Sequence, residues 1–91
     1  MSQTNPILRK AVVRVLRCQV ALQKATTQAQ VYRAEGALRS AERNAMRVWV
    51  QGTTEGRAAR MRYLYQPMSM ELEAAAAVSR AINQAKKEAV L

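Results

Sequence analysis

The sequence predicts an all-α protein built as an elongated antiparallel helical hairpin, and three observations support this fold class. Residues 7–51 contain no proline and a single glycine, Gly36. Alanine, the residue with the highest helix propensity, occurs 17 times. Apolar residues recur in steps of three and four along most of the chain, which is the spacing of one helix face. We therefore expect a single helical domain over residues 6–91, preceded by a flexible N-terminal tail at residues 1–5.

The first expected element is one long helix over residues 6–51. Asn5 and Pro6 form a favourable start, because Asn caps free backbone N–H groups and Pro suits the first helical position. A helix of this length would be a rod of roughly 65–70 Å. Its apolar positions form two coiled-coil-like seams. The first seam is Leu8, Ala11, Val15, Cys18, Leu22, Ala25 and Ala29, and the second is Val31, Ala34, Leu38, Ala41, Ala45 and Val48.

The two seams are rotated against each other by about a quarter turn, and the offset falls at Thr26, Thr27 and Gln28. Either the helix bends there, or it stays continuous and presents two faces to two partners. Because none of these three residues breaks a helix by itself, we expect a continuous helix. Gly36 weakens the middle of that helix and is expected to allow close packing of another helix, with a functional hinge as the alternative.

Two shorter segments are expected after a break. Residues 52–56, with the sequence GTTEG, combine two glycines with polar residues and predict a turn. Residues 57–65 predict a short helical connector, which Pro67 should end. A second helix is expected over residues 69–89, capped by Ser69, with an apolar stripe that begins at Met70. It would fold back antiparallel on the end of the long helix.

The predicted hairpin leaves the N-terminal half of the long helix uncovered. A returning helix of about 20 residues reaches only about 30 Å, so it would not cover Leu8, Val15 and Leu22. We expect this part of the first seam to meet another chain, and we therefore predict an oligomer and a weakly stable isolated chain.

Further candidates for a protein interface are the arginine and aromatic residues near the break, because Arg, Trp and Tyr are favoured interface anchors. They are Trp49, Arg57, Arg60, Arg62, Tyr63 and Tyr65. The alternatives are that Tyr63, Leu64 and Tyr65 plug the end of the hairpin and that the connector contacts nucleic acid. For Trp49, packing is favoured over stacking on a ligand.

The chain is strongly basic, which favours an acidic partner. It has 15 Lys and Arg residues against 6 Glu and no Asp, a formal net charge of +9. The candidate contacts to nucleic-acid phosphates or to an acidic protein surface are the bases on one face of the first helix. They are Arg9, Lys10, Arg14, Arg17 and Lys24. The alternatives for this face are a solvated surface and a membrane-surface helix.

Arg39, Arg43 and Arg47 form a ladder at a spacing of four residues, where like charges repel each other. An acid from elsewhere, such as Glu71 or Glu73 of the returning helix, could pair with the ladder. Without such an acid, the ladder is a second patch for a partner.

The residue types on which most enzymes depend are missing, so we predict a protein that is not an enzyme. The chain has no His, no Asp and no phosphate-binding loop. No catalytic residue, metal ligand or cofactor is therefore predicted. The single cysteine, Cys18, fits a small buried hydrophobe in a reducing compartment. Because no apolar run has the length of a membrane span and no cleavable signal is found, integral membrane insertion is not expected. We expect the cytoplasm, or a particle assembled there.

These features favour a non-enzymatic structural protein that packs with other copies or other chains in a larger assembly. The composition is typical of small basic helical proteins in phage particles and other nucleoprotein assemblies, although no motif supports that comparison. The first alternative is an autonomous DNA- or RNA-binding protein without sequence specificity. The second alternative is a small helical inhibitor or adaptor that binds an acidic protein surface. Other protein chains are therefore the first expected partners, and nucleic acid is the next.

Overall fold

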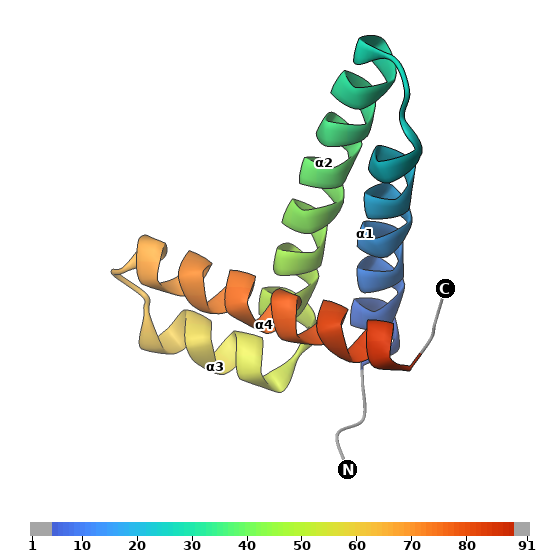
Figure 1. The fold of residues 1–91 in the computed structure, drawn as a ribbon. Helices are drawn as coiled ribbons and strands as arrows, with labels where there is room; N and C mark the ends of the chain where they lie inside the picture. Colours follow the sequence, from blue (N-terminus) through green and yellow to red (C-terminus); the bar gives the residue numbers. More distant parts are fainter. Residues whose placement is uncertain (1–4, 89–91) are drawn as a thin grey trace.

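The computed structural model describes residues 5–88, and all regular secondary structure in that range is helical (Figure 1). Four helices follow one another: α1 (Pro6–Lys24), α2 (Gln28–Gly52), α3 (Thr54–Arg62) and α4 (Pro67–Lys87). The prediction of an all-α protein with a helical hairpin is confirmed. The predicted tail, apart from Asn5, and the predicted end of the last helix at residue 89 lie outside the described residues.

The helices form two hairpins that meet at an angle (Figure 1). α1 and α2 run antiparallel and make the long hairpin, while α3 and α4 make the short hairpin. α4 crosses the base of the long hairpin, where α1 begins and α2 ends, and contacts both helices. The backbone measures 43 × 31 × 16 Å along its principal axes. The result is a thin, L-shaped molecule and not a rod.

The prediction of one continuous helix over residues 6–51 is wrong, because the chain reverses direction between Lys24 and Gln28. Thr27 and Gln30 form a capping box that starts α2. The Thr27 hydroxyl accepts the N–H of Gln30 at 3.2 Å, and Oε1 of Gln30 accepts the N–H of Thr27 at 3.3 Å. The same oxygen accepts the N–H of Thr26 at 2.9 Å. Polar residues that do not break a helix alone therefore organise a new helix start, and the two offset seams belong to two facing helices.

Because the chain folds back at this point, α2 covers much of α1. Leu8 and Val15 were predicted to need another chain, yet they are only 7% and 0% exposed in the monomer. Leu22, nearer the turn, is half-buried. The prediction that the N-terminal seam stays uncovered is therefore wrong for Leu8 and Val15. A polar residue at position 15 would disturb the fold itself.

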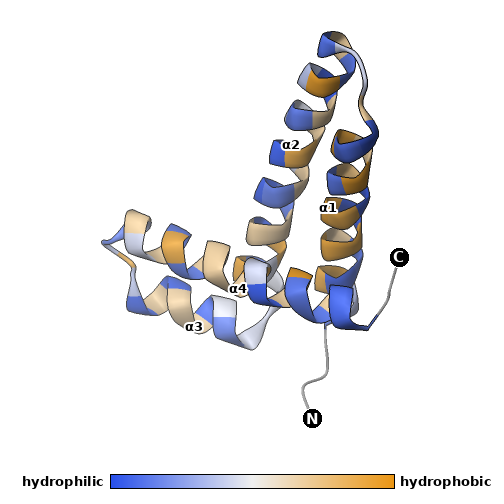
Figure 2. Ribbon diagram, in the orientation of Figure 1, coloured by the Kyte–Doolittle hydropathy of each residue, from blue (hydrophilic) through white to orange (hydrophobic). Residues whose placement is uncertain are grey.

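The hydrophobic core lies at the base of the long hairpin, where α4 packs across α1 and α2. Val12, Val15 and Leu16 of α1 are its largest fully buried side chains. They belong to one cluster with Ala41, Ala45 and Trp49 of α2 and with the buried face of α4. Figure 2 shows hydrophobic and hydrophilic residues along α1, as expected for a helix with one buried and one polar face. Trp49, which was expected among the interface residues, is only 7% exposed and packs within this cluster, so its side chain is buried in the monomer.

The predicted turn over residues 52–56 is wrong in length, because Thr53 alone separates α2 from α3. The Thr53 hydroxyl donates to the Trp49 carbonyl at 2.6 Å and accepts the N–H of Gly56 at 2.9 Å. It thereby ends one helix and caps the next. Gly56 lies so close to the end of α2 that an added Cβ would overlap the Trp49 carbonyl. The second glycine of the motif thus permits a sharp corner between two helices.

The connector predicted over residues 57–65 is α3, and it begins earlier and ends earlier than expected. Pro67 is the first residue of α4, so the last helix starts before the predicted Ser69. Proline suits that position because its missing N–H would have no partner in the helix. Ser69 is not the cap, and its hydroxyl lies 3.4 Å from Oε1 of Gln66 instead.

We expect Gly56→Ala and Gly36→Ala to change stability in opposite directions. A methyl group at position 56 collides with backbone that cannot move away, which should cost about 1–3 kcal/mol. At position 36 the methyl group meets nothing within 4 Å, so alanine should add about 0.5–1 kcal/mol through helix propensity. Chemical denaturation followed by circular dichroism measures both changes. A tolerated alanine at position 56 would contradict the tight corner.

Thr27→Ala should lower the free energy of unfolding by about 1 kcal/mol, because it removes the side-chain cap of α2. Thr54→Ala is the matched control, since Thr54 is exposed in the first turn of α3 and Thr53 caps that helix. Thermal and chemical denaturation of the two variants provide the measurement. If both variants unfold alike, the capping box does not hold the turn between α1 and α2.

Candidate functional site

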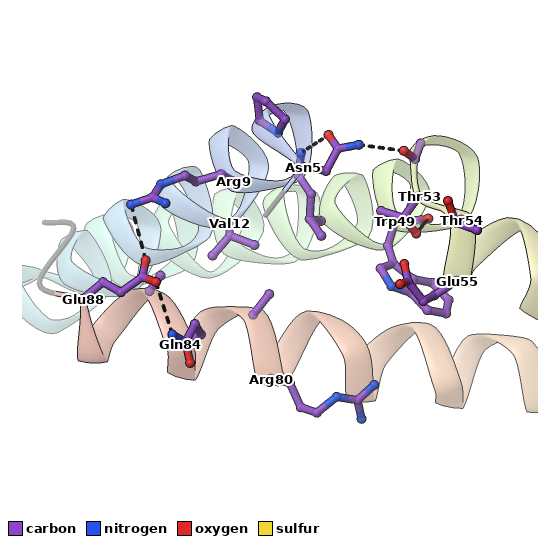
Figure 3. Close-up of a pocket in the computed structure, with 15 residues that line it drawn as sticks. Asn5, Arg9, Val12, Trp49, Thr53, Thr54, Glu55, Arg80, Gln84 and Glu88 are labelled. Carbon is purple, nitrogen blue, oxygen red and sulfur yellow. Dashed lines mark hydrogen bonds and ion pairs between the residues drawn. The ribbon is translucent and has the colours of Figure 1, made fainter. Parts of the chain in front are cut away.

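A cleft of about 590 Å³ lies where the start of α1, the corner between α2 and α3, and α4 meet (Figure 3). Asn5 bridges two of these elements, because its Nδ2 donates to the Gly52 carbonyl at 2.7 Å. Arg9 and Glu88 form an ion pair of 3.4 Å at the other side. The two carboxylates of the cleft, Glu55 and Glu88, lie at opposite ends. They therefore cannot share a proton or a metal ion, and the contacts of the cleft fasten α1 to its neighbours.

Residues 5–88 hold no group of three or more His, Cys, Asp or Glu side chains that could bind a metal ion. Cys18 is a half-buried free thiol on α1. Over the same residues, no helix combines the length and the apolar character that crossing a membrane requires. The surfaces that remain as candidates are one apolar and two basic.

The short hairpin exposes large apolar side chains near its free end. In the described chain, seven large hydrophobic residues are exposed, and five of them lie between positions 61 and 72. They are Met61, Leu64, Tyr65, Met68 and Leu72. Tyr65, in the connection between α3 and α4, is 90% exposed. Exposed apolar side chains gathered in one region of a small protein are typical of an interaction site.

From Met68 to Asn83 the outer face of α4 carries no charged residue, and Lys86 lies on the same face one turn further on. One arc of the helix carries Met68, Leu72, Ala75, Ala76, Ser79 and Asn83, and all six are exposed. The buried residues of α4, such as Val78 and Ile82, lie on the other side. A helix face that is apolar and small, with no charge over four turns, suits the packing of another helix.

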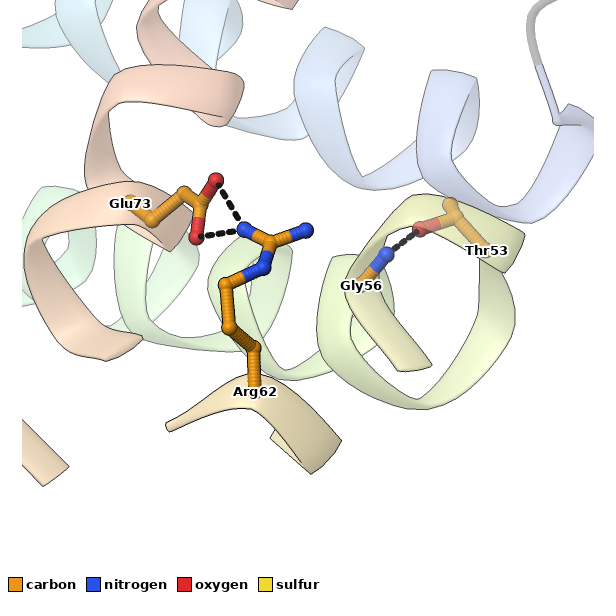
Figure 4. A network of polar contacts seen from close by, with 4 residues as sticks. All are labelled: Thr53, Gly56, Arg62 and Glu73. Carbon is orange, nitrogen blue, oxygen red and sulfur yellow. Dashed lines mark hydrogen bonds and ion pairs between the residues drawn. The ribbon is translucent and has the colours of Figure 1, made fainter. Parts of the chain in front are cut away.

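The predicted interface residues around α3 are divided between internal contacts and solvent. Arg62 binds Glu73 of α4, with Nη1 at 3.1 Å from both carboxylate oxygens (Figure 4). The adjacent Tyr63 side chain, and after it the negatively charged Glu73, stabilise the charged guanidinium of Arg62. They therefore raise the pKa of Arg62 above its ordinary value. Tyr63 is half-buried and packs against the core, as expected for a plug at the end of a hairpin. Tyr65 and Arg60 are exposed, and Arg57 is exposed while its Nε donates to the Gln51 carbonyl at 3.1 Å.

Most of the basic residues predicted as nucleic-acid contacts lie on the solvent side of α1. Lys10, Arg14, Arg17 and Lys24 are exposed and project from the side opposite the buried seam. Arg9 differs, because its ion pair with Glu88 ties it to the end of α4. The structure therefore brings four of the five predicted bases together on one face, and their role in binding stays a prediction.

α2 carries a second basic stripe on the side opposite its buried residues. Arg39, Arg43 and Arg47 are exposed there and recur about every 6 Å along the helix axis. Of the two predicted acids from α4, Glu73 is engaged by Arg62 instead. Within residues 5–88, no ion pair involves any of the three arginines. Glu35 lies one turn before Arg39 on the same helix, but it forms no ion pair with the ladder in the described part of the chain.

The expected packing of a helix against Gly36 is wrong for contacts within residues 5–88. A Cβ at this position would meet nothing within 4 Å. Gly36 instead lines a shallow hollow on the outer side of α2. Its lining residues are Tyr32, Arg33, Gly36, Ala37, Arg39, Ser40 and Arg43.

Two features of these surfaces were not expected from the sequence. Met61, Met68 and Leu72 were not among the expected interface residues, although the helical phase of the stripe from Met70 already places Met68 and Leu72 outside. Tyr32, which is 78% exposed beside the arginine ladder, was not among them either.

Comparison with known proteins gives no further guide, because no family model, no curated protein and no solved structure matches this chain.

Proposed function

We propose that the protein is a non-enzymatic assembly subunit that docks on another protein chain through its short hairpin, first of all on a second copy of itself. The observation that carries this proposal is the exposure of five large hydrophobic side chains between positions 61 and 72. Burial of such a side chain is favourable by about 1.5–3 kcal/mol. A partner chain that covers several of these side chains therefore stabilises the complex relative to the separate monomers.

The distribution of charge favours the short hairpin as the docking surface. Residues 5–53 carry nine Lys and Arg residues against two Glu, whereas residues 54–88 carry six against four. Two copies that met through their long hairpins would place many like charges side by side, which is unfavourable. Contact through the short hairpins leaves the long hairpins apart, because the two hairpins point in different directions (Figure 1).

The order of large and small side chains along the outer face of α4 favours a two-fold pairing. Its first half carries the large Met68 and Leu72, and its second half carries the small Ala76 and Ser79. In an antiparallel pair of α4 helices, the large half of each helix meets the small half of the other. Such self-complementarity is the requirement for a symmetric dimer.

Met68→Gln combined with Leu72→Gln should abolish self-association without unfolding the chain. Both residues are more than 70% exposed, and glutamine is a good helix former, so the folded monomer should lose little stability. Light scattering coupled to size-exclusion chromatography measures the mass of the particle. About 1 M salt, where the Debye length is about 3 Å, screens repulsion between the basic chains and releases bound nucleic acid.

Ile7→Gln is the control, because Ile7 is an exposed hydrophobic residue outside the short hairpin, at the start of α1. The control should associate like the wild type, while the double variant should be monomeric and equally helical. A wild-type chain that stays monomeric at high concentration and high salt would contradict the proposal. So would a double variant that associates like the control.

The alternative of a small inhibitor or adaptor on an acidic protein surface stays a prediction. It would use the basic faces of the long hairpin and leave the exposed end of the short hairpin without a role. Docking through the short hairpin explains why apolar side chains are exposed at its end. It also leaves the basic faces of the long hairpin free for another ligand.

A further inference from the structure

We propose that the outer face of α2 binds single-stranded nucleic acid, with Arg39, Arg43 and Arg47 on the phosphate backbone and a base stacked on Tyr32. This site is separate from the docking surface of the short hairpin, so it does not depend on the proposed assembly function. It also differs from the face of α1 that the sequence favoured.

The charges of this face are available for an external ligand. Arg39, Arg43 and Arg47 are exposed in a single row, and none of them takes part in an ion pair within residues 5–88. A row of like charges at a spacing of four residues destabilises a helix. An anionic chain laid along the row removes that repulsion and releases its own counterions.

The hollow beside the arginines suits the close approach of a backbone. Its lining includes Gly36 and the small residues Ala37 and Ser40. A glycine inside a helix lowers stability, and no contact within the described chain requires it, because a Cβ would meet open space. The missing side chain instead lets a ligand reach the surface of the helix between Tyr32 and Arg43.

The aromatic residue distinguishes nucleic acid from an acidic protein as the occupant. Tyr32 is 78% exposed at the edge of the hollow, and exposed aromatic rings beside a basic groove are stacking platforms for unpaired bases. Apart from Tyr32, the face carries no large apolar residue that the core of a protein interface would need. The face of α1 lacks an exposed aromatic ring altogether.

Arg39→Gln combined with Arg43→Gln should lower the salt dependence of binding. Each lost phosphate contact removes about 0.7 from the slope of log K against log salt for a single strand. The double variant should therefore lose about 1.4 in slope. The probe is a labelled oligothymidylate of about 16 nucleotides, and fluorescence anisotropy of the full chain at several salt concentrations gives the slope.

Arg57→Gln combined with Arg60→Gln is the matched control, because it removes two exposed arginines of α3 and the same net charge. It should leave the slope unchanged. Equal slopes for the two double variants would overturn the proposal, since binding would then depend only on net charge. Loss of binding in Arg14→Gln with Arg17→Gln, but not at positions 39 and 43, would move the site to α1 and also overturn it.

Two further variants test the hollow and the ring separately from the charge. Tyr32→Leu should weaken binding about tenfold through lost stacking. Gly36→Gln should weaken binding by filling the hollow, while the chain remains as stable as the wild type or becomes more stable. Unchanged affinity in both variants, or equal affinity for a polyglutamate peptide, would overturn the proposal in favour of an acidic protein partner.

Discussion

The packing of α1 on the alanine face of α2 is the contact on which the rest of the structure depends. Ala41 and Ala45 are 0% exposed, and the larger Val12 and Leu16 of α1 are buried with them in one cluster. Because alanine projects little from its helix, the two axes can approach closely, and the side chains of α1 fill the space between them. This arrangement sets the start of α1 beside the end of α2, where Asn5 donates to the Gly52 carbonyl. α4 can then cross both helices at once and close the core.

The helical content and the buried faces could be predicted from the sequence, because periodicity depends only on the residues of one segment. The turn between α1 and α2 could not be found by searching for a helix breaker, since the chain has none there. Its signal was instead the capping-box pattern of Thr27 and Gln30 together with the offset of the two seams. The corner at Gly56 is different in kind. It depends on where the Trp49 carbonyl lies in space, and no local pattern reports that position.

The candidate surfaces also combine features that the sequence could predict with features that it could not. Exposure of Lys10, Arg14 and Arg17 follows from helical phase, so the sequence could predict it. The internal partners of Arg9 and Arg62 could not be predicted, because Glu88 and Glu73 reach them only through the course of α4 across the other helices. The course of α4 therefore also determines which arginines form no ion pair within the described residues. The ladder on α2 forms no ion pair with α4 in the described chain because α4 passes the base of the long hairpin and not its outer side (Figure 1).

The L shape separates an apolar docking end from the basic faces, and this separation has a thermodynamic consequence. If two copies dock through their short hairpins, each dimer presents two copies of the stripe of Arg39 and Arg43 on separate arms. A single nucleic-acid strand that reaches both arms binds the second one at a high effective concentration, so its overall affinity exceeds that of one arm. By linkage, the bound strand must in turn stabilise the dimer by the same free energy. Assembly and nucleic-acid binding would then reinforce each other without any contact between the two surfaces.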